Sequence, residues 1–397
     1  MPYWLTKPRE VRPGEAAKAM RYFIYGYYGF GNFGDDLMLS AIVHQVGMRD
    51  ADAKFTVKCR APIEELGPAV EFLSAETILE LPQPAWLRGL RYLWALFRGL
   101  RRHDWLIIGG GALFLDKGAI NKSLVLLWCL VLRARLMGLR IAVIGVSCDL
   151  LANPLSLWFA RSIFRQASVV RVRDQFSLDY GRYFGIRDIR LCADLAFSSP
   201  HLTPEALSAI RAPRLEPATI PPKRRIGICL VDYFAVYEPD PIRRQAFIVR
   251  MAASLKNHAA EADYIYISLQ EGQGLGDDRV HAALRTTVTF ADYRSIRTLG
   301  EALELCGDLD GIVTMRYHLG LLGAATGVAV VALCHELKLV SVALMPGVRS
   351  TSLLDLVSDR GADPVGNLLA SHAVKSRQTP DMDLLRRESL ANFDWLK

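Results

Sequence analysis

Arg316 and His318 are the residues of this sequence with the clearest capacity for chemistry. They follow a short apolar run, 311–314, that is typical of a buried strand, and they precede a small-residue stretch typical of a helix. An arginine and an imidazole at a strand end, just before a helix N-terminus, predict an anion site beside a group that titrates near neutral pH. Lys338 follows the next apolar run, 329–333, and predicts a further cation at the same edge of the sheet as Arg316 and His318. The alternative is an ordinary surface lysine.

A glycine-rich segment at 29–34 is followed directly by two carboxylates, Asp35 and Asp36. Its spacing is formally the dinucleotide fingerprint GxGxxG, but carboxylates at a helix start repel a pyrophosphate. An NADP enzyme that uses Arg60 is one alternative, and a tight turn with Asp35 as a helix cap is another. We expect Asp35 and Asp36 to hold sugar hydroxyls or to remove their protons. The neighbouring candidates for substrate contact are Gly31, Asn32 and Gly34.

Further candidates follow three other apolar runs. Gly110 and Gly111 belong to a run of three glycines, which exposes backbone N–H groups to a ligand or, equally, allows two chain segments to pack closely. Ser147 follows the run 140–145 and offers a hydroxyl. Arg173 ends the run 169–172, and its forked guanidinium suits a carboxylate or phosphate; a plain ion pair between domains is the alternative.

Short apolar runs alternate with helical stretches along the chain, and these elements must position the candidates. The runs are 22–26, 54–58, 105–108, 140–145 and 169–172, then, after a proline-spaced stretch, 225–230, 264–269, 311–314 and 329–333. This alternation predicts an α/β protein with two Rossmann-like doubly wound domains facing a cleft. We expect an N-terminal domain at 20–200, a linker at 201–224 and a C-terminal domain at 225–397. Ligands bind at the carboxyl ends of the strands in such sheets.

Composition restricts the partners and the compartment. The net charge of +7 favours anionic partners: phosphorylated small molecules, an anionic membrane surface or nucleic acid. Seven widely spaced cysteines without a CxxC pair fit buried thiols in a reducing compartment, and they predict no metal site. The first twenty residues show no apolar signal core, and the longest apolar run, 124–132, is too short to span a membrane. We therefore expect a cytoplasmic protein.

The stretch 86–102 has its own pattern. At helical spacing Arg88, Arg91, Arg98 and Arg102 fall on one side and Trp86, Leu90, Leu93, Phe97 and Leu100 on the other, and no acid interrupts them. This predicts a helix in peripheral contact with the anionic inner leaflet of the membrane. The alternative is a core helix whose apolar face is packed and whose arginines are solvated.

Several ordered stretches resemble the polysaccharide pyruvyl transferase family. They are 26–39 (GYYGFGNFGDDLML), 109–116 (GGGALFLD), 144–151, 172–177 (VRDQFS), 193–197 (ADLAF) and 314–338. The run at 144–149 (IGVSCD) and the residues 335–338 (HELK) depart from the common family pattern.

This resemblance implies a two-domain fold like that of GT-B glycosyltransferases. It also implies transfer of pyruvate from phosphoenolpyruvate, as a ketal, to hydroxyls of a polysaccharide repeat unit or its lipid-linked precursor. The family's essential histidine and basic residues match His318, Arg316 and Lys338. We then expect phosphoenolpyruvate as donor on the C-terminal side, a sugar acceptor on the N-terminal side, no cofactor and no nucleic-acid partner.

Two other functions fit the same predicted fold. A GT-B glycosyltransferase would use a nucleotide sugar, but its ribose-binding glutamate would lie near position 322, where this chain has Leu322. A non-catalytic binding protein would not need Arg316, His318 and Asp36 together.

Overall fold

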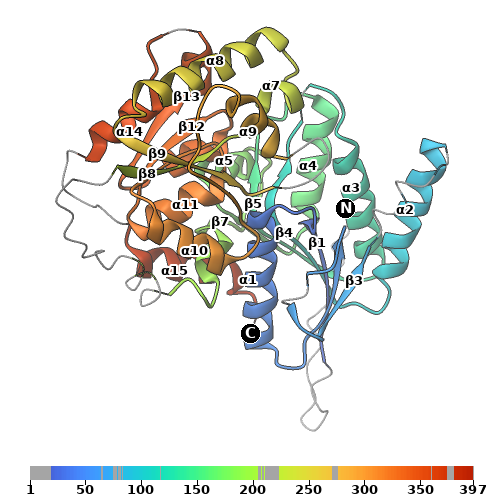
Figure 1. The fold of residues 1–397 in the computed structure, drawn as a ribbon. Helices are drawn as coiled ribbons and strands as arrows, with labels where there is room; N and C mark the ends of the chain where they lie inside the picture. The colour runs from blue at the N-terminus through green and yellow to red at the C-terminus, as the bar shows by residue number, and fades with distance from the viewer. Residues whose placement is uncertain are drawn as a thin grey trace.

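The computed structural model describes residues 19–396, apart from 64–65, 75–77, 79–81, 83, 117, 204–206, 208–209, 211–222, 271–275, 359 and 373–379. The described chain forms two parallel sheets with helices packed on both faces (Figure 1). Their strand orders are β3-β2-β1-β4-β5-β6-β7 and β10-β9-β8-β11-β12-β13. In each sheet the chain starts near the centre, winds to one edge, then returns and winds to the other. The two expected Rossmann-like domains are confirmed.

Apolar and β-branched residues form the central strands of the first sheet. Its strands are β1 (Arg21–Tyr28), β2 (Lys54–Cys59), β3 (Val70–Leu73), β4 (Trp105–Phe114), β5 (Arg140–Cys148), β6 (Val169–Val172) and β7 (Ile189–Leu191). The five predicted runs are β1, β2, β4, β5 and β6. The edge strands β3 and β7 were not predicted, because an edge strand has one partner and its side chains are partly exposed.

Helices cover the first sheet on both faces. They are α1 (Phe33–Arg49), α2 (Ala85–Gly99), α3 (Lys122–Leu136), α4 (Pro154–Gln166), α5 (Gln175–Tyr183) and the 3-10 turn η3 (Leu195–Ser198). Asparagine side chains cap two of them, since Asn121 accepts a hydrogen bond from the Ser123 N–H at 2.9 Å and Asn153 accepts one from Leu155 N–H at 3.0 Å. The predicted helix at 86–102 is α2, but it ends at Gly99. Arg102 lies in the following turn with φ +68°.

The second sheet repeats the plan. Its strands are β8 (Arg224–Cys229), β9 (Ala262–Ser268), β10 (Asp292–Ser295), β11 (Gly311–Thr314), β12 (Ala329–Cys334) and β13 (Val348–Ser352). Its helices are α7 (Tyr233–Val236), α8 (Pro241–Asn257), α9 (Asp278–Leu284), α10 (Leu299–Asp308), α11 (Tyr317–Thr326), α12 (Leu337–Ala343), α13 (Leu353–Val357) and α14 (Pro364–His372). Helix α11 is buried on nearly all sides. Gly323 permits this, because a Cβ there would lie 2.7 Å from a methyl group of Val330.

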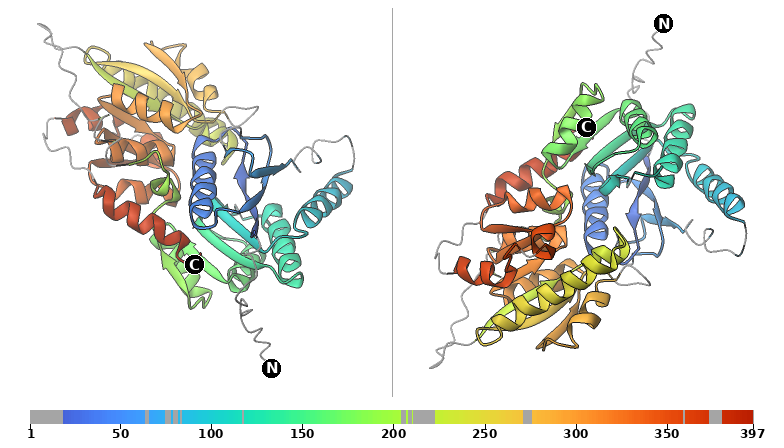
Figure 2. Two further views of the ribbon diagram at one scale, coloured as in Figure 1. Left: turned by 90° about the horizontal axis from the view of Figure 1, so that it is seen from below. Right: turned by 90° about the horizontal axis from the view of Figure 1, so that it is seen from above.

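The end of the chain returns to the first domain through α15 (Met382–Leu390) and η4 (Ala391–Phe393), shown in red in Figure 2. Buried hydrogen bonds hold it there. Ser389 donates to the Asp194 carbonyl at 2.7 Å, and Asn392 donates to the Ala193 carbonyl at 3.0 Å and accepts the Gly145 N–H at 3.1 Å. Most of the expected linker, at 204–206, 208–209 and 211–222, lies outside the described residues. None of the described helices is both long and apolar enough to cross a membrane.

Candidate active site

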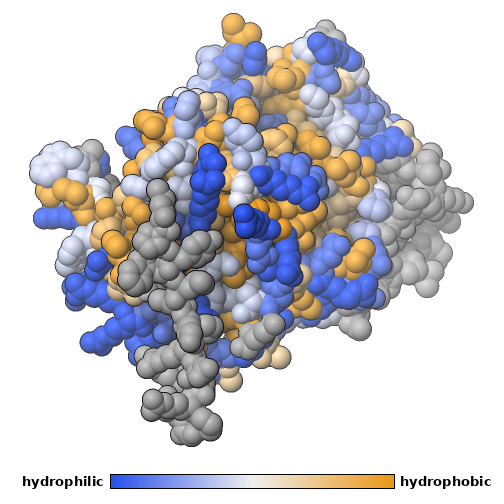
Figure 3. All heavy atoms as spheres, turned by 180° about the vertical axis from the view of Figure 1, so that it is seen from behind, coloured by the Kyte–Doolittle hydropathy of each residue, from blue (hydrophilic) through white to orange (hydrophobic). Residues whose placement is uncertain are grey.

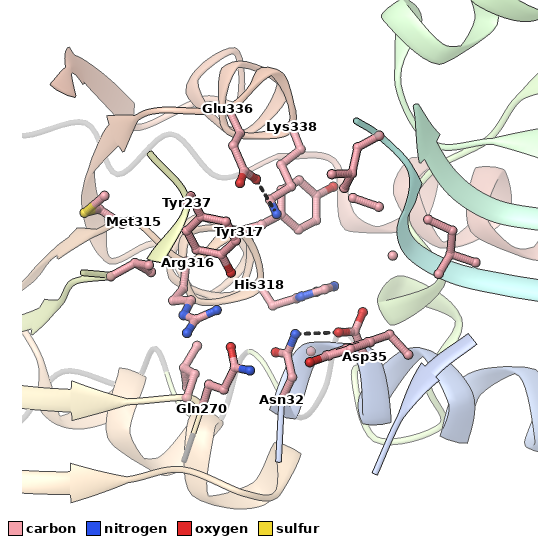
Figure 4. A pocket seen from close by; sticks show the side chains of 18 of the residues that line it. Asn32, Asp35, Tyr237, Gln270, Met315, Arg316, Tyr317, His318, Glu336 and Lys338 are labelled. Carbon is pink, nitrogen blue, oxygen red and sulfur yellow. Dashed lines mark hydrogen bonds and ion pairs between the residues drawn. The ribbon is translucent and has the colours of Figure 1, made fainter. Parts of the chain in front are cut away.

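A cavity of about 360 Å³ lies between the carboxyl ends of the two sheets (Figure 4). Parallel strands place all their carboxyl ends at one edge, so residues from distant parts of the sequence meet there. Eight of the residues predicted from the sequence line this cavity: Asn32, Gly34, Asp35, Gly111, Arg173, Arg316, His318 and Lys338.

The glycine-rich segment joins the two domains beside the cavity. Gly29 and Gly31 adopt left-handed backbone conformations, with φ +71° and +69°, which turn the chain sharply from β1 into α1. The next residue, Asn32, forms a β-bridge with Gln270 of the second domain. The Phe33 N–H donates to the Leu269 carbonyl at 3.1 Å. This turn therefore fixes the start of α1 against the end of β9.

Asp35 is a buried carboxylate in the first turn of α1. The Asn32 side-chain amide donates a hydrogen bond to it. Burial raises the pKa of Asp35, and this effect outweighs the opposing positive charges of His318 and Lys338. Gly111 makes room for the carboxylate, because a Cβ at that position would lie 2.7 Å from Asp35 Oδ1.

His318 lies in the first turn of α11 and reaches across the domain boundary. Its Nδ1 faces Gly34 of the first domain, where a Cβ would lie only 1.8 Å away. Its Nε2 is buried and lies 3.7 Å from Asp194 Oδ1, and within the described residues it has no hydrogen-bond partner. The imidazole is thus enclosed by first-domain residues on two sides, and Figure 4 shows it extending from the second domain toward Asp35.

Asp194 anchors the first-domain side of this arrangement. It is buried and accepts a hydrogen bond from Arg173 Nη1 at 2.8 Å. Although burial alone would raise its pKa, Arg173 and His318 hold the pKa of Asp194 well below the usual range. Arg173 also stacks on the ring of Tyr317, 4.5 Å from the ring centre, and so contacts the second domain.

Arg316 is fixed by a second buried carboxylate. Its Nε lies 3.0 and 3.2 Å from the two carboxylate oxygens of Asp277, and its Nη2 binds the same group. Although burial opposes the charged form, this carboxylate raises the pKa of Arg316. Asp277 is itself held by the Leu269 N–H at 3.0 Å. The Arg316 guanidinium is therefore held in one orientation at the cavity, before any ligand binds.

Lys338 lies in the first turn of α12, at the cavity rim. Its ammonium group is 2.5 Å from a carboxylate oxygen of Glu336, and its side chain is partly exposed. The neighbouring His335 ring is buried, which lowers the pKa of His335 to about 4, so this imidazole is neutral at physiological pH.

Sequence reasoning missed Asp194 and Asp277 as site residues. Asp194 lies in the stretch 193–197 that carried the family resemblance, so its position in that stretch was the available signal. No sequence motif pointed to Asp277.

Two predicted residues lie behind the cavity wall. Ser147 is buried and accepts a hydrogen bond from Arg173 Nε at 2.6 Å while donating to Asp174 at 2.7 Å. Gly110 has φ +65° and packs against Met38, where a Cβ would lie 3.1 Å from the methionine side chain. Both positions shape the wall without lining the cavity.

Gly31 and Asp36 line a second cavity of about 370 Å³ on the other side of the glycine-rich segment. Asp36 accepts the Gly29 N–H at 2.8 Å, which helps to close the turn. Burial raises the pKa of Asp36 to about 7.

We expect Asp36→Asn to stabilise the protein in a pH-dependent way. The folded state binds the Asp36 proton more tightly than the unfolded state, so the aspartate's contribution is complete at acidic pH and is lost as pH rises toward about 7. Asparagine cannot ionise, so the variant does not lose this stability as the pH rises. Its free energy of unfolding should exceed that of the wild type by on the order of 2 kcal/mol at about pH 8 and by far less at about pH 4. Denaturant unfolding at both pH values measures it, with the exposed Asp52→Asn as control. An equal effect at both pH values would contradict the assignment.

Comparison with known families agrees with this geometry. A sequence model of the polysaccharide pyruvyl transferase family matches residues 32–334, from the glycine-rich turn to the end of β12. The chain belongs to this family. A search of curated proteins gives no match.

Solved structures share the fold of this pyruvyl transferase family member at low sequence identity. The UDP-N-acetylglucosamine 2-epimerase of Methanocaldococcus jannaschii, in complex with UDP-GlcNAc and UDP, has a TM-score of 0.59 at 10% identity and covers 94% of this chain and 99% of its own. The putative epimerase of Listeria monocytogenes gives 0.58 at 10%, covering 95% and 96%. A glycosyltransferase of Rickettsia africae gives 0.52 at 9%, covering 95% and 93%. These likenesses show a GT-B-like fold.

Proposed function

We propose that this protein transfers pyruvate from phosphoenolpyruvate to two hydroxyls of a sugar in an exopolysaccharide or cell-surface glycan, or in its lipid-linked precursor. The observation that supports this most directly is the convergence of Arg316, Lys338, Arg173 and His318 on one cavity between the domains. Phosphoenolpyruvate carries a phosphate and a carboxylate on a three-carbon frame, so its site needs several cations at short range. No cofactor is required.

The two arginines suit different tasks in donor binding. Arg316 is oriented by Asp277, so it presents its remaining N–H groups without a large entropic cost when the anion arrives. Arg173 is engaged by Asp194 and stacked on Tyr317, so it supplies positive charge to the cavity wall. Lys338, at the partly exposed rim, completes the anion site once its ammonium leaves Glu336.

The reaction needs one proton delivered to carbon and two removed from hydroxyls. Protonation of the methylene carbon leaves an oxocarbenium-like centre at C2, which the first hydroxyl oxygen attacks. The bond from C2 to the phosphate oxygen then breaks, inorganic phosphate leaves, and the second hydroxyl closes the ketal. His318 is suited to these transfers because its ring lies in the cavity between Asp194 and the start of α1.

The acceptor belongs on the first-domain side of the cavity. Asp35 lines this side and has a raised pKa, which makes its ionised form a stronger base toward a sugar hydroxyl. Asp36 faces the second cavity, so Asp35 is the better candidate of the two. A lipid-linked acceptor would place the enzyme in the cytoplasm as a peripheral protein at the inner membrane.

The rival function, a glycosyltransferase that uses a nucleotide sugar, is favoured only by the fold likeness to nucleotide-sugar enzymes. The position expected to hold the ribose is Leu322, whose side chain is fully buried among apolar residues of α11 and its neighbours. It offers no group for a ribose diol.

Thermal-shift titration distinguishes the two donors. Phosphoenolpyruvate at about a hundred times its Kd should raise the melting temperature by about 3 °C, because a ligand that binds only the folded state stabilises it. UDP and GDP sugars should give no comparable shift. Arg316→Lys should weaken the effect of phosphoenolpyruvate, since a point charge does not reproduce the guanidinium fork.

A complementary assay measures phosphate release from phosphoenolpyruvate with and without a synthetic glycoside acceptor. Release that depends on the acceptor is the expected result. Stabilisation by nucleotide sugars alone, with no phosphate release, would overturn the proposal and favour the glycosyltransferase.

A further inference from the structure

Helices α2, α3, α4 and α5 pack against the face of the first sheet that is turned away from the second domain. The first three carry eight basic residues, three on α2, three on α3 and two on α4, and no acidic residue, whereas α5 carries Asp179 in an exposed ion pair with Arg182. Exposed helices of a globular protein ordinarily mix both signs of charge. A predominantly basic surface is complementary to an anionic one.

Large apolar side chains are exposed on the same helices. On α2, Trp86 is 68% exposed, Leu90 58% and Trp94 62%, and on α4, Leu155 is 51% and Trp158 52% exposed. The core-facing side of α2 is formed by Tyr92, Leu96 and the following Leu100. The alternative of a fully packed apolar face is therefore wrong for α2, and so is the expected assignment of Leu100 to the membrane side. In Figure 3 the protruding helix at the left edge shows hydrophobic and hydrophilic residues side by side on its surface.

Of these exposed side chains, Trp86 lies in the first turn of α2 and Leu155 in the first turn of α4. Each helix after a parallel strand begins at the carboxyl edge of the sheet, so the first turns of α2 and α4 share the edge at which the cavity opens. The loop before α3 connects the two features directly. Ile120 is 46% exposed, while the adjacent Asn121 and nearby Ser123 line the cavity itself.

We propose that the exposed side of α2, the first two turns of α4 and Ile120 form a docking surface for an anionic lipid bilayer. Tryptophan and leucine side chains enter the headgroup boundary, and the arginines of α2 bind lipid phosphates. The surface places the cavity mouth at the bilayer, where a lipid-linked acceptor presents its sugar. The inference rests on the proposed acceptor for its purpose, but binding to lipid is measurable without any donor or acceptor.

Flotation with vesicles tests the surface. The complete chain should float with phosphatidylcholine vesicles that contain phosphatidylglycerol at low salt, and much less with pure phosphatidylcholine or at high salt. Arg91→Glu with Arg98→Glu, and separately Trp86→Ser with Trp94→Ser and Trp158→Ser, should each weaken the partition coefficient at least about tenfold. These side chains are largely exposed, and Trp158 also packs beside Trp128, with 5.4 Å between the ring centres. Circular dichroism should therefore be unchanged and the melting temperature should fall only slightly.

Matched controls come from the second domain. Ile242→Ser removes an apolar side chain that is 82% exposed, and Arg285→Glu reverses an exposed charge; both should float like the wild type. Failure of the wild type to float, or equal flotation of all variants, would overturn the proposal. So would a dimer in sedimentation velocity that the tryptophan variants dissociate, because the surface would then join two copies of this chain. Flotation without phosphate release would leave the docking surface standing and reject the proposed reaction.

Discussion

His318→Ala is expected to fold normally and to lose between about two and four orders of magnitude in turnover, the usual contribution of a general acid–base group. The ring lies in the cavity, between Asp194 and the first turn of α1, and so is placed to exchange protons with bound substrates. Phosphate release under saturating donor and acceptor measures the loss. The melting temperature should change little, because the truncated ring faces a cavity.

The exposed His201→Ala is the matched control and should retain full activity. Near wild-type turnover in His318→Ala would remove this histidine from the mechanism.

Asp194→Ala is expected to destabilise the protein by about 3–5 kcal/mol, since it leaves the buried Arg173 guanidinium without its carboxylate. It should also impair turnover, because Asp194 is the carboxylate beside His318 Nε2. Asp194 acts as a positioning residue in this view. Denaturant unfolding measures the first effect and phosphate release the second.

Two further variants test this prediction, one that removes the charge of Asp194 but keeps its shape, and one that breaks an exposed ion pair in place of the buried one. Asp194→Asn keeps the side-chain volume, so it should recover part of the stability while leaving the pH profile of turnover displaced from that of the wild type. Asp179→Ala removes a carboxylate from an exposed ion pair with Arg182 and should cost less than about 1 kcal/mol. Equal losses in Asp194→Ala and Asp179→Ala would contradict the role assigned to the buried pair.

The sequence predicted the centre of each sheet and not its edges. Central parallel strands are buried on both faces, so they read as short continuous apolar runs, as in β4, β5 and β11. Edge strands such as β10 and β7 contain charged residues, because one side of each meets solvent. A search for apolar runs alone therefore assigns such edge segments to loops.

The strand-end rule also predicted much of the site. Arg316, His318, Arg173 and Lys338 each follow a predicted strand, and parallel topology brings those strand ends to one edge. The rule does not say how far along the edge a residue lies or which way its side chain points. Ser147 and Asp36 therefore satisfied the same rule, yet one lies behind Arg173 and the other faces a second cavity.

The sequence by itself thus determined the two doubly wound domains, the family resemblance and the cations of the site, because these depend on local periodicity and on residues next to strand ends. The tertiary structure alone decided the partners that hold those cations. Asp277 is 39 positions from Arg316, and Asp194 meets His318 only because the two domains close on each other. It also decided which face of α2 is buried, because only the side of this helix that carries Tyr92 and Leu96 packs against the sheet, while Trp86 and Trp94 stay exposed.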